Sequence, residues 1–390
     1  PQAVDVDGDG DLDFLSGSDN GGTILYFEQL DDGWQPVVTA QAPSTVEALI
    51  LEGDVALNGD SPTRIWRQGY QSWCWSGVTD TEEIEFDPET GLPLVGGDGD
   101  GTSATEEKPY TSWWNGLLGK EDGSSLFVGA LASTKTKFWT AFSSEQIWVV
   151  WGARGENIFL EAGEELRLDP FWIKTGTDAF DLHRQYAEVA ASYHDLAPRT
   201  DQPPVGWATW YTFYEDISEE IILDNLGSAA ALAENTQLEP MLVFQIDDGW
   251  QKYWGDWTAN EEFPSGMQAL AEQIQNTGFI PGLWMAPFYV SVETEIYQQQ
   301  ADWWVRDEDN NPIRFSNLGA GDYAILDVTH PEAGPWMRDQ VAARVTDGWE
   351  YFKLDFLYAG AQEGKRYADV TGMEAFHIGM EYLMDALDGR

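Results

Sequence analysis

Residues 241–250 read MLVFQIDDGW, and this stretch decides the fold. Its first six residues are apolar enough for a buried strand, and two carboxylates and a glycine follow directly. A helical pattern then runs from Ser265 to about Asn276, closed by Gly278, before a second apolar strand at residues 279–285. A buried strand, a helix and another buried strand in this order predict a parallel sheet with helices on its faces.

The same alternation of strands and helices extends over residues 201–390. The further predicted elements are a strand at 206–213, a helix from Ser218, a short helix at 294–300, a helix from a Thr329/Glu332 capping box to Arg344, a strand at 351–356 and a helix from a Thr371/Glu374 capping box. About four β/α units in series predict the first half of a TIM-type barrel. We expect the other half to follow Arg390, because the chain appears cut at both ends.

The preceding residues predict a different architecture. Residues 39–175 have no helical period; short apolar or alternating strands are separated by Gly, Asp and Pro turns, which predicts a β-sandwich. Residues 176–200 predict a linker helix that Pro198 ends. The sequence therefore predicts a multidomain β plus α/β chain, with a β-sandwich ahead of the partial barrel.

Residues 1–38 predict a small unit of their own. Carboxylates occupy every second position, and Gly10 stands sixth in a run formed by Asp5, Asp7, Asp9, Asp11 and Asp13. Alternating oxygen ligands and a glycine for a sharp turn are typical of calcium loops, although Ser16 replaces the glutamate that closes an EF-hand. The stretch resembles an FG-GAP/VCBS repeat with a structural Ca²⁺ at residues 5–13. The alternative is an acidic turn without metal.

Composition excludes several classes of function. The formal net charge is −48, from 68 Asp and Glu against 20 Lys and Arg, and such a surface repels nucleic acids and anionic lipids. Cys74 is the only cysteine, so no internal disulfide forms, and no apolar run is long enough for membrane insertion. We expect a secreted or cell-surface protein, acidic either through adaptation to salt or as an ordinary secreted enzyme. The composition leaves open whether it forms oligomers.

Chemistry-bearing residues gather where the predicted barrel strands end. They are Trp210, Asp247, Asp248, Trp284, Lys353 and Asp355. Lys353 and Asp355 are two apart on one strand and face the same side, so the lysine keeps the aspartate ionised. An anionic carboxylate facing a pocket suits a glycosidase nucleophile; the alternative is a buried ion pair that only holds the barrel together. Asp247 and Asp248 have their own alternative as turn formers before Gly249.

Several motifs, taken together in this order, resemble glycoside hydrolase family 36, the α-galactosidases or melibiases. In the α/β region they are GWATW at 206–210, DDGW at 247–250, GDW at 255–257, FPSG at 263–266, GLW at 282–284, LDVTHP at 326–331 and KLDF at 353–356. In the β region they are GYQSW at 69–73 and SWWNGLLG at 112–119.

This resemblance implies roles for the residues. Asp355 matches the nucleophile of a covalent galactosyl-enzyme, and Lys353 matches a lysine that binds ring hydroxyls. Asp247 and Asp248 match the pair that reads O4 and O6, and Trp210 and Trp284 match pocket-wall aromatics. The family's acid/base aspartate would lie beyond Arg390 and not on this chain, so we expect little turnover from these 390 residues alone.

The resemblance implies hydrolysis of terminal α-galactosides in oligo- or polysaccharides by a retaining mechanism, with no cofactor for catalysis. The alternatives are an α-N-acetylgalactosaminidase, a raffinose-synthase-like transglycosylase, or a calcium-dependent surface protein for carbohydrate binding and adhesion. Two departures bear on the substrate. Many members have an arginine where residues 319–322 stand here, with Arg314 the nearest candidate, and a glutamate where Met285–Pro287 stand.

Overall fold

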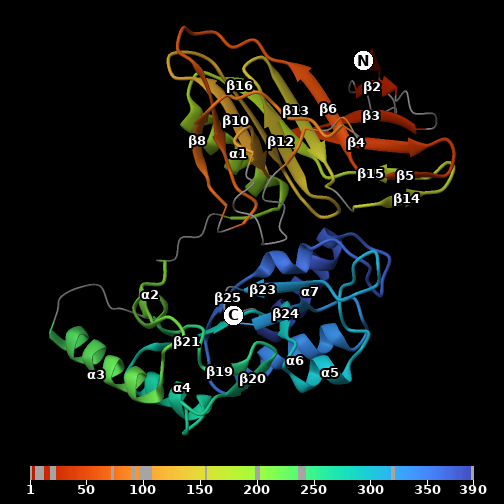
Figure 1. Cartoon of the computed structure of the whole chain (residues 1–390). Coiled ribbons are helices and arrows are strands. Elements are labelled where there is room, and N and C mark those ends of the chain that lie inside the picture. The colour runs from red at the N-terminus through yellow and green to blue at the C-terminus, as the bar shows by residue number, and fades with distance from the viewer. Residues whose placement is uncertain are drawn as a thin grey trace. The chain divides into compact units, whose positions relative to one another are not determined.

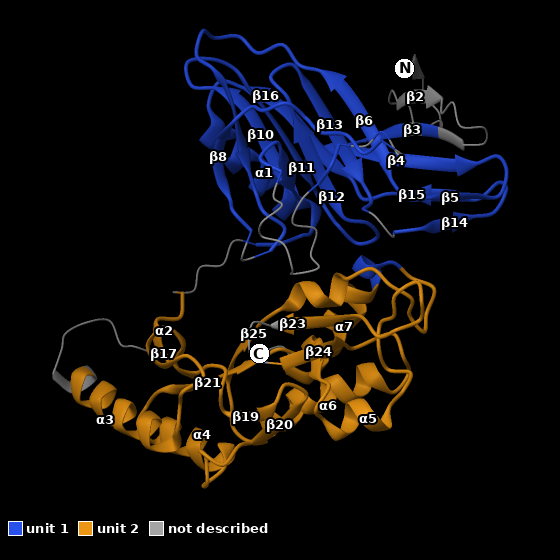
Figure 2. Ribbon diagram, viewed as in Figure 1, with its two compact units in different colours: residues 1–199, 371–374 blue, residues 200–370, 375–390 orange. Residues whose placement is uncertain are grey.

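The computed structural model describes eleven stretches of the chain: residues 2–4, 13–17, 23–71, 74–88, 91, 93–95, 108–153, 156–197, 203–235, 243–317 and 321–387. The chain divides into two compact units, one of residues 1–199 with 371–374 and one of residues 200–370 with 375–390 (Figure 2).

Unit 1 is built from antiparallel sheets (Figure 1). The larger has ten strands in the order β1 (Gln2–Val4), β2 (Asp13–Gly17), β3 (Thr23–Leu30), β4 (Gly33–Ala40), β16 (Phe171–Gly176), β11 (Ser125–Ala130), β10 (Asn115–Lys120), β7 (Thr63–Arg67) and β8 (Gly77–Asp80), with β15 (Glu165–Arg167) on β4. A four-stranded sheet runs β6 (Leu49–Asp54), β13 (Gln146–Trp151), β12 (Phe138–Phe142) and β9 (Thr111–Trp113). A two-stranded sheet pairs β14 (Ile158–Leu160) with β5 (Ser44–Val46).

Aromatic side chains join the two large sheets of unit 1. The ring of Trp151 on β13 lies 5.0 Å from that of Phe171 on β16 and 6.4 Å from that of Phe27 on β3. All three side chains are buried, so the core lies between the sheets. The predicted β-rich domain is therefore present as a multi-sheet domain.

The structure differs from the predicted boundary between residues 38 and 39. That boundary falls inside β4, whose Val37, Val38 and Ala40 are buried, and β4 pairs with β3, β15 and β16. The continuous apolar run of β4 thus makes residues 23–40 part of the large sheet. Of the predicted calcium loop, Asp5, Asp7, Asp9 and Asp11 lie outside the described residues, and the side chain of Asp13 is not described.

The predicted linker helix is α1 (Ala179–Tyr193), which belongs to unit 1. The Asp178 carboxylate caps it by accepting from the amides of Phe180 and Asp181. Its inner face packs with β11 and β16 through Leu182, and the Tyr186 hydroxyl donates to the carbonyl of Ala130 at 2.6 Å. The helix therefore packs onto the β domain and does not span a gap between domains.

Unit 2 contains a parallel sheet of four strands. They are, in order, β17 (Gly206–Ala208), β18 (Val243–Ile246), β21 (Ile280–Met285) and β25 (Tyr351–Leu354). The other elements are α2 (Trp210–Phe213), α3 (Glu219–Asn235), β19 (Gln251–Tyr253), β20 (Asp256–Ala259), α4 (Met267–Asn276), β22 (Tyr289–Ser291), α5 (Glu295–Gln299), β23 (Arg314–Asn317), β24 (Gly321–Ile325), α6 (Ala333–Thr346), a 3₁₀ turn (Leu357–Ala361) and α7 (Gly372–Leu387). The α/β region is confirmed; its completion to a barrel stays a proposal.

Two local predictions in unit 2 need correction. The predicted strand 206–213 ends at Ala208, because the chain turns into helical geometry at Thr209 and continues as α2. Thr329 and Glu332 do not form a capping box, because the Thr329 hydroxyl donates to Asp327 instead. The second predicted box is confirmed: the amide of Thr371 donates to Glu374, and the amide of Glu374 donates back to the Thr371 hydroxyl.

Candidate active site

The carboxyl ends of the parallel strands bring the predicted site residues to one edge of the sheet. Trp284 on β21 is the register partner of Lys353 on β25, and the amide of Asp355 donates to the carbonyl of Met285 at 2.9 Å. Asp247 follows β18 directly, and β18 pairs with β21. Ligand sites in open α/β sheets lie at this end of the strands.

Lys353 links two carboxylates of this edge. Its Nζ lies 2.9 Å from Oδ2 of Asp247 and 3.9 Å from Oδ2 of Asp355. Asp247 is buried, whereas the side chains of Lys353 and Asp355 are 37% and 35% exposed. Lys353 therefore lies close to both carboxylates, and the side chain of Asp355 stays partly open to solvent.

Asp247 is held by neutral donors in addition to the lysine. Gln245, two residues earlier on β18, donates through Nε2 to Oδ2 at 2.6 Å, and the amide of Asp248 donates to Oδ1 at 3.0 Å. The backbone amide of Asp247 itself donates to the hydroxyl of Thr209 at 2.9 Å. Thr209 is fully buried, so the turn after β17 fixes the end of β18.

Asp355 receives one hydrogen bond on each oxygen. The indole Nε1 of Trp284 donates to Oδ2 at 3.0 Å, and the amide of Phe356 donates to Oδ1 at 2.8 Å. Phe356 has a positive φ of 54°, so the chain turns directly after Asp355. The two donors therefore hold the Asp355 carboxylate in one orientation.

The two predicted pocket-wall aromatics have different surroundings from those expected. Trp284 is 1% exposed; its ring lies in the core and its N–H serves Asp355. Trp210 belongs to α2 and not to a strand, and its half-buried ring lies 5.6 Å from that of Tyr214. The early end of β17 at Ala208 places Trp210 in a helix and not at a strand end.

Asp248 has surroundings that sequence reasoning did not anticipate. Its Oδ1 accepts from Nε2 of Gln251 at 2.5 Å and from Nε1 of Trp254 at 3.1 Å. Burial, with a smaller contribution from Glu215, raises the pKa of Asp248 to about 7. Gln251 and Trp254 come from the β19–β20 hairpin, which begins directly after DDGW, so only their closeness in sequence could have indicated them.

Arg314 is the nearest candidate for the arginine that many family members have at residues 319–322. It lies on β23, and its Nη2 donates to the hydroxyl of Tyr297 at 2.6 Å while its guanidinium lies 5.5 Å from the centre of that ring. These contacts tie Arg314 to α5. In the described stretches, no group of three or more His, Cys, Asp or Glu side chains could hold a metal ion.

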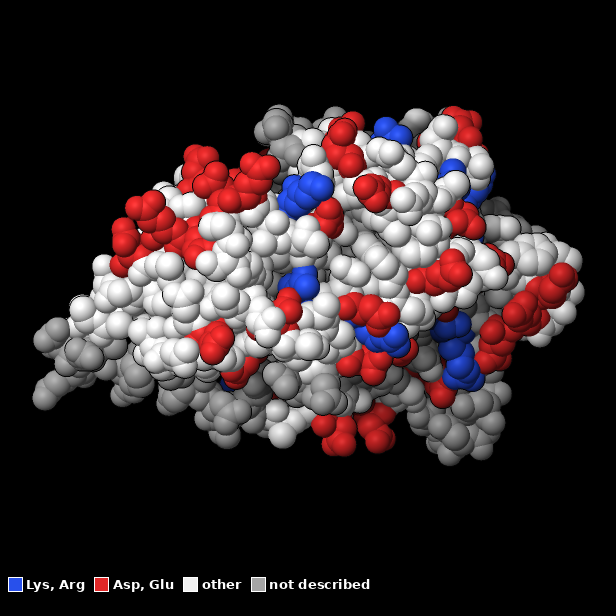
Figure 3. All heavy atoms as spheres, turned by 90° about the horizontal axis from the view of Figure 1, so that it is seen from below, with Lys and Arg blue, Asp and Glu red and all other residues white. Residues whose placement is uncertain are grey.

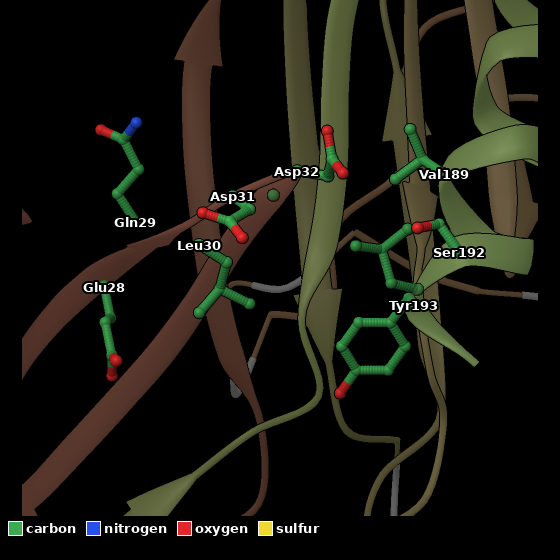
Figure 4. Close-up of a pocket in the computed structure, with 10 residues that line it drawn as sticks. Glu28, Gln29, Leu30, Asp31, Asp32, Val189, Ser192 and Tyr193 are labelled. Atoms are coloured by element: carbon green, nitrogen blue, oxygen red, sulfur yellow. The ribbon is translucent and has the colours of Figure 1, made fainter. Parts of the chain in front are cut away.

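A separate cavity of about 500 Å³ lies in unit 1 (Figure 4). The β3–β4 turn and the C-terminal part of α1 form most of its wall, with Asp31, Asp32 and Tyr193 among the lining residues. None of the predicted catalytic or substrate-binding residues lines it.

Acidic side chains outnumber basic ones on the face drawn in Figure 3, in keeping with the net charge. Among the helices that the structure describes, none has the length and apolar character needed to cross a membrane.

Comparison with known proteins gives one family and several relatives. The sequence model of the melibiase family matches residues 179–388, more than half of the chain. Alpha-galactosidase AgaA of Geobacillus stearothermophilus is 30% identical over an alignment of 131 residues, and the match covers 30% of this chain and 17% of that protein. An A type blood α-D-galactosamine galactosaminidase from Flavonifractor plautii is 29% identical over an alignment of 130 residues, and the match covers 29% of this chain and 11% of that protein.

The fold also matches solved structures. The α-galactosidase TtGalA of Thermus thermophilus, solved with p-nitrophenyl α-D-galactopyranoside, has a TM-score of 0.63 at 27% identity; the match covers 93% of this chain and 69% of that one. The same enzyme was solved with stachyose. This chain thus corresponds to part of the length of the curated relatives that it matches.

Proposed function

The chain belongs to the melibiase family, and we propose on that basis that it acts on terminal α-galactosides as a retaining α-galactosidase. The observation that carries the proposal is the position of Lys353, whose Nζ lies between Asp247 and Asp355 at 2.9 and 3.9 Å. A lysine close to both a buried carboxylate and a partly exposed one supports Asp355 as an accessible carboxylate beside a cation.

The chemistry follows from these roles. One oxygen of Asp355 attacks the anomeric carbon as the bond from that carbon to the leaving oxygen breaks, and a covalent galactosyl-Asp355 forms. Trp284 and the amide of Phe356 hold the carboxylate in one orientation. Asp247 and Asp248 bind sugar hydroxyls, and Lys353 contributes a further donor. Water then releases galactose with retention of configuration.

The proton for the leaving oxygen is proposed to come from an acid outside residues 1–390, as the family resemblance implies. A substrate whose leaving group departs without taking up a proton does not need this acid. Release of fluoride from α-galactosyl fluoride therefore tests the nucleophile alone, because the C–F bond breaks to give free fluoride ion.

The test compares α-galactosyl fluoride, α-glucosyl fluoride and melibiose with the 390-residue chain. We expect fluoride release from the galactosyl compound, loss of that release in Asp355→Asn, and little cleavage of melibiose. Fluoride release that survives Asp355→Asn, or that favours the glucosyl compound, would contradict the proposal.

A second substrate class has one observation in its favour, the likeness to the Flavonifractor plautii galactosaminidase. Comparing nitrophenyl α-galactoside with nitrophenyl α-N-acetylgalactosaminide on a longer protein that includes the acid would decide between them. Transglycosylation, secretion and calcium-dependent adhesion stay predictions. Ca²⁺ titration of the chain and of Asp9→Asn tests the calcium loop.

A further inference from the structure

Asp247 and Asp248 are adjacent in sequence, but their side chains meet opposite electrostatic surroundings. Asp247 has the Lys353 ammonium at 2.9 Å and further donors on both oxygens. Asp248 is 4% exposed, and within the described residues no Lys or Arg nitrogen forms an ion pair with it. A buried carboxylate without a cation is costly, and it becomes neutral by binding a proton.

The hydrogen bonds of Asp248 indicate where that proton lies. The side-chain donors Gln251 Nε2 and Trp254 Nε1 both reach Oδ1, at 2.5 and 3.1 Å. An oxygen that accepts two N–H groups serves as the carbonyl oxygen of a carboxylic acid, which leaves Oδ2 to carry the proton.

Trp254 is fixed in the orientation that this arrangement requires. Its ring stacks on Tyr323, with centroids 4.1 Å apart and planes 26° apart, and lies 5.0 Å from the ring of Phe356. It also lies 5.3 Å from Trp284. The indole that donates to Asp248 is therefore packed against the indole that donates to Asp355, so one aromatic cluster orients both carboxylates.

The groups around Asp248 act on its pKa in both directions, and burial dominates. Burial raises the pKa of Asp248 most and Glu215, from the loop after α2, raises it further, whereas Gln251, Trp254 and the amide of Gly249 lower it. Burial raises the pKa of Tyr323 from β24, so this neighbour stays a neutral phenol. On the neighbouring strand ends, Lys353 pairs with Asp247 and Asp355, so its charge is shared by two other carboxylates.

We propose that Asp248 binds galactose as a neutral carboxylic acid, donating a hydrogen bond from Oδ2 to a sugar hydroxyl, while ionised Asp247 accepts from a neighbouring hydroxyl. Trp254 is the positioning residue that keeps Oδ1 as the acceptor. The proposal rests on the proposed galactoside specificity, and it gives two adjacent aspartates opposite hydrogen-bonding roles.

The matched variants are Asp248→Asn and Asp247→Asn, with D-galactose binding to the 390-residue chain measured by calorimetry at pH 5.5 and 8.5. Asparagine reproduces a protonated aspartate, with one acceptor oxygen and one donor group. We expect Asp248→Asn to bind within about threefold of wild type at pH 5.5 and equally well at pH 8.5. Asp247→Asn should lose most binding at both pH values, because it removes the charge that pairs with Lys353.

Wild type should bind about 30-fold more weakly at pH 8.5, because only the neutral fraction of a group with pKa about 7 is competent. Trp254→Phe keeps the ring stack but removes the N–H, so the midpoint of this pH dependence should move upwards. A purely structural role for Trp254 would weaken binding without moving the midpoint.

Loss of binding in Asp248→Asn equal to that in Asp247→Asn, with normal wild-type binding, would overturn the neutral-acid proposal and leave the galactosidase proposal standing. Failure of wild type to bind galactose at either pH would overturn both.

Discussion

Replacing Asp248 by asparagine should change how the stability of the protein depends on pH. The pKa of Asp248 is raised from 3.8 to about 7, so the folded state holds this proton more tightly than the unfolded state. The resulting stabilisation is complete below pH 3.8 and is lost as the pH rises towards about 7. The difference of about 3.2 pKa units corresponds to about 4 kcal/mol over that whole window.

The measurable part lies between pH 5 and pH 8. About 2 of these pKa units lie above pH 5. The free energy of unfolding of wild type should therefore fall by about 3 kcal/mol relative to that of Asp248→Asn between pH 5 and pH 8. Urea unfolding followed by tryptophan fluorescence, at both pH values, gives the two free energies of unfolding. Comparison with the exposed Asp309, replaced by asparagine, corrects for the general effect of removing one negative charge.

The result that would refute the reasoning is a difference between wild type and Asp248→Asn that stays constant from pH 5 to pH 8. Asp248 would then be ionised in the folded protein throughout, and the unpaired buried charge would need a partner that the structure does not show among its described residues.

Trp284→Phe keeps an aromatic ring but removes the N–H that donates to Asp355, so the rate of fluoride release from α-galactosyl fluoride should fall about 10–100-fold. An unchanged rate would show that this hydrogen bond does not orient the nucleophile. Lys353→Met leaves Asp247 buried without its cation and should lower the free energy of unfolding by about 2 kcal/mol, an effect that the partial exposure of the lysine limits. Adding Asp247→Asn should restore part of this free energy, and no restoration would argue against the ion pair. Thr209→Val leaves the Asp247 amide without its acceptor and should lower the free energy of unfolding in urea by about 1–3 kcal/mol, whereas Thr209→Ser should stay near wild type. Equal stability of the two variants would contradict the role of the hydroxyl.

The pattern of strands and helices in unit 2 was predictable because buried parallel strands are short apolar runs between amphipathic helices. Residues 241–246 and 279–285 predicted β18 and β21 to within two residues. The end of β17 was not predictable from propensity, because the turn at Thr209 depends on a hydrogen bond from Asp247, 38 residues away. Likewise the Thr329 hydroxyl has a competing partner, Asp327, so the expected capping box did not form.

The candidate site could be predicted only in part, for a similar reason. The two-residue spacing of Lys353 and Asp355 indicated a shared face, but the spacing alone did not show that Lys353 lies nearer to Asp247 than to Asp355. Trp254 had no signal of its own, because its role depends on a hairpin that folds back over Asp248. Residues that act through another side chain are visible only when distant segments are brought together.

Labelling of Asp355 by a C5-fluorinated α-galactosyl fluoride tests the central claim most directly. The carboxylate should displace fluoride without needing a proton donor, and the second fluorine should slow hydrolysis of the ester enough for peptide mass spectrometry. We predict a galactosyl adduct on the peptide that contains Asp355 and none in Asp355→Asn. An adduct on any other carboxylate, or an equal adduct in that variant, would contradict the assignment of the nucleophile.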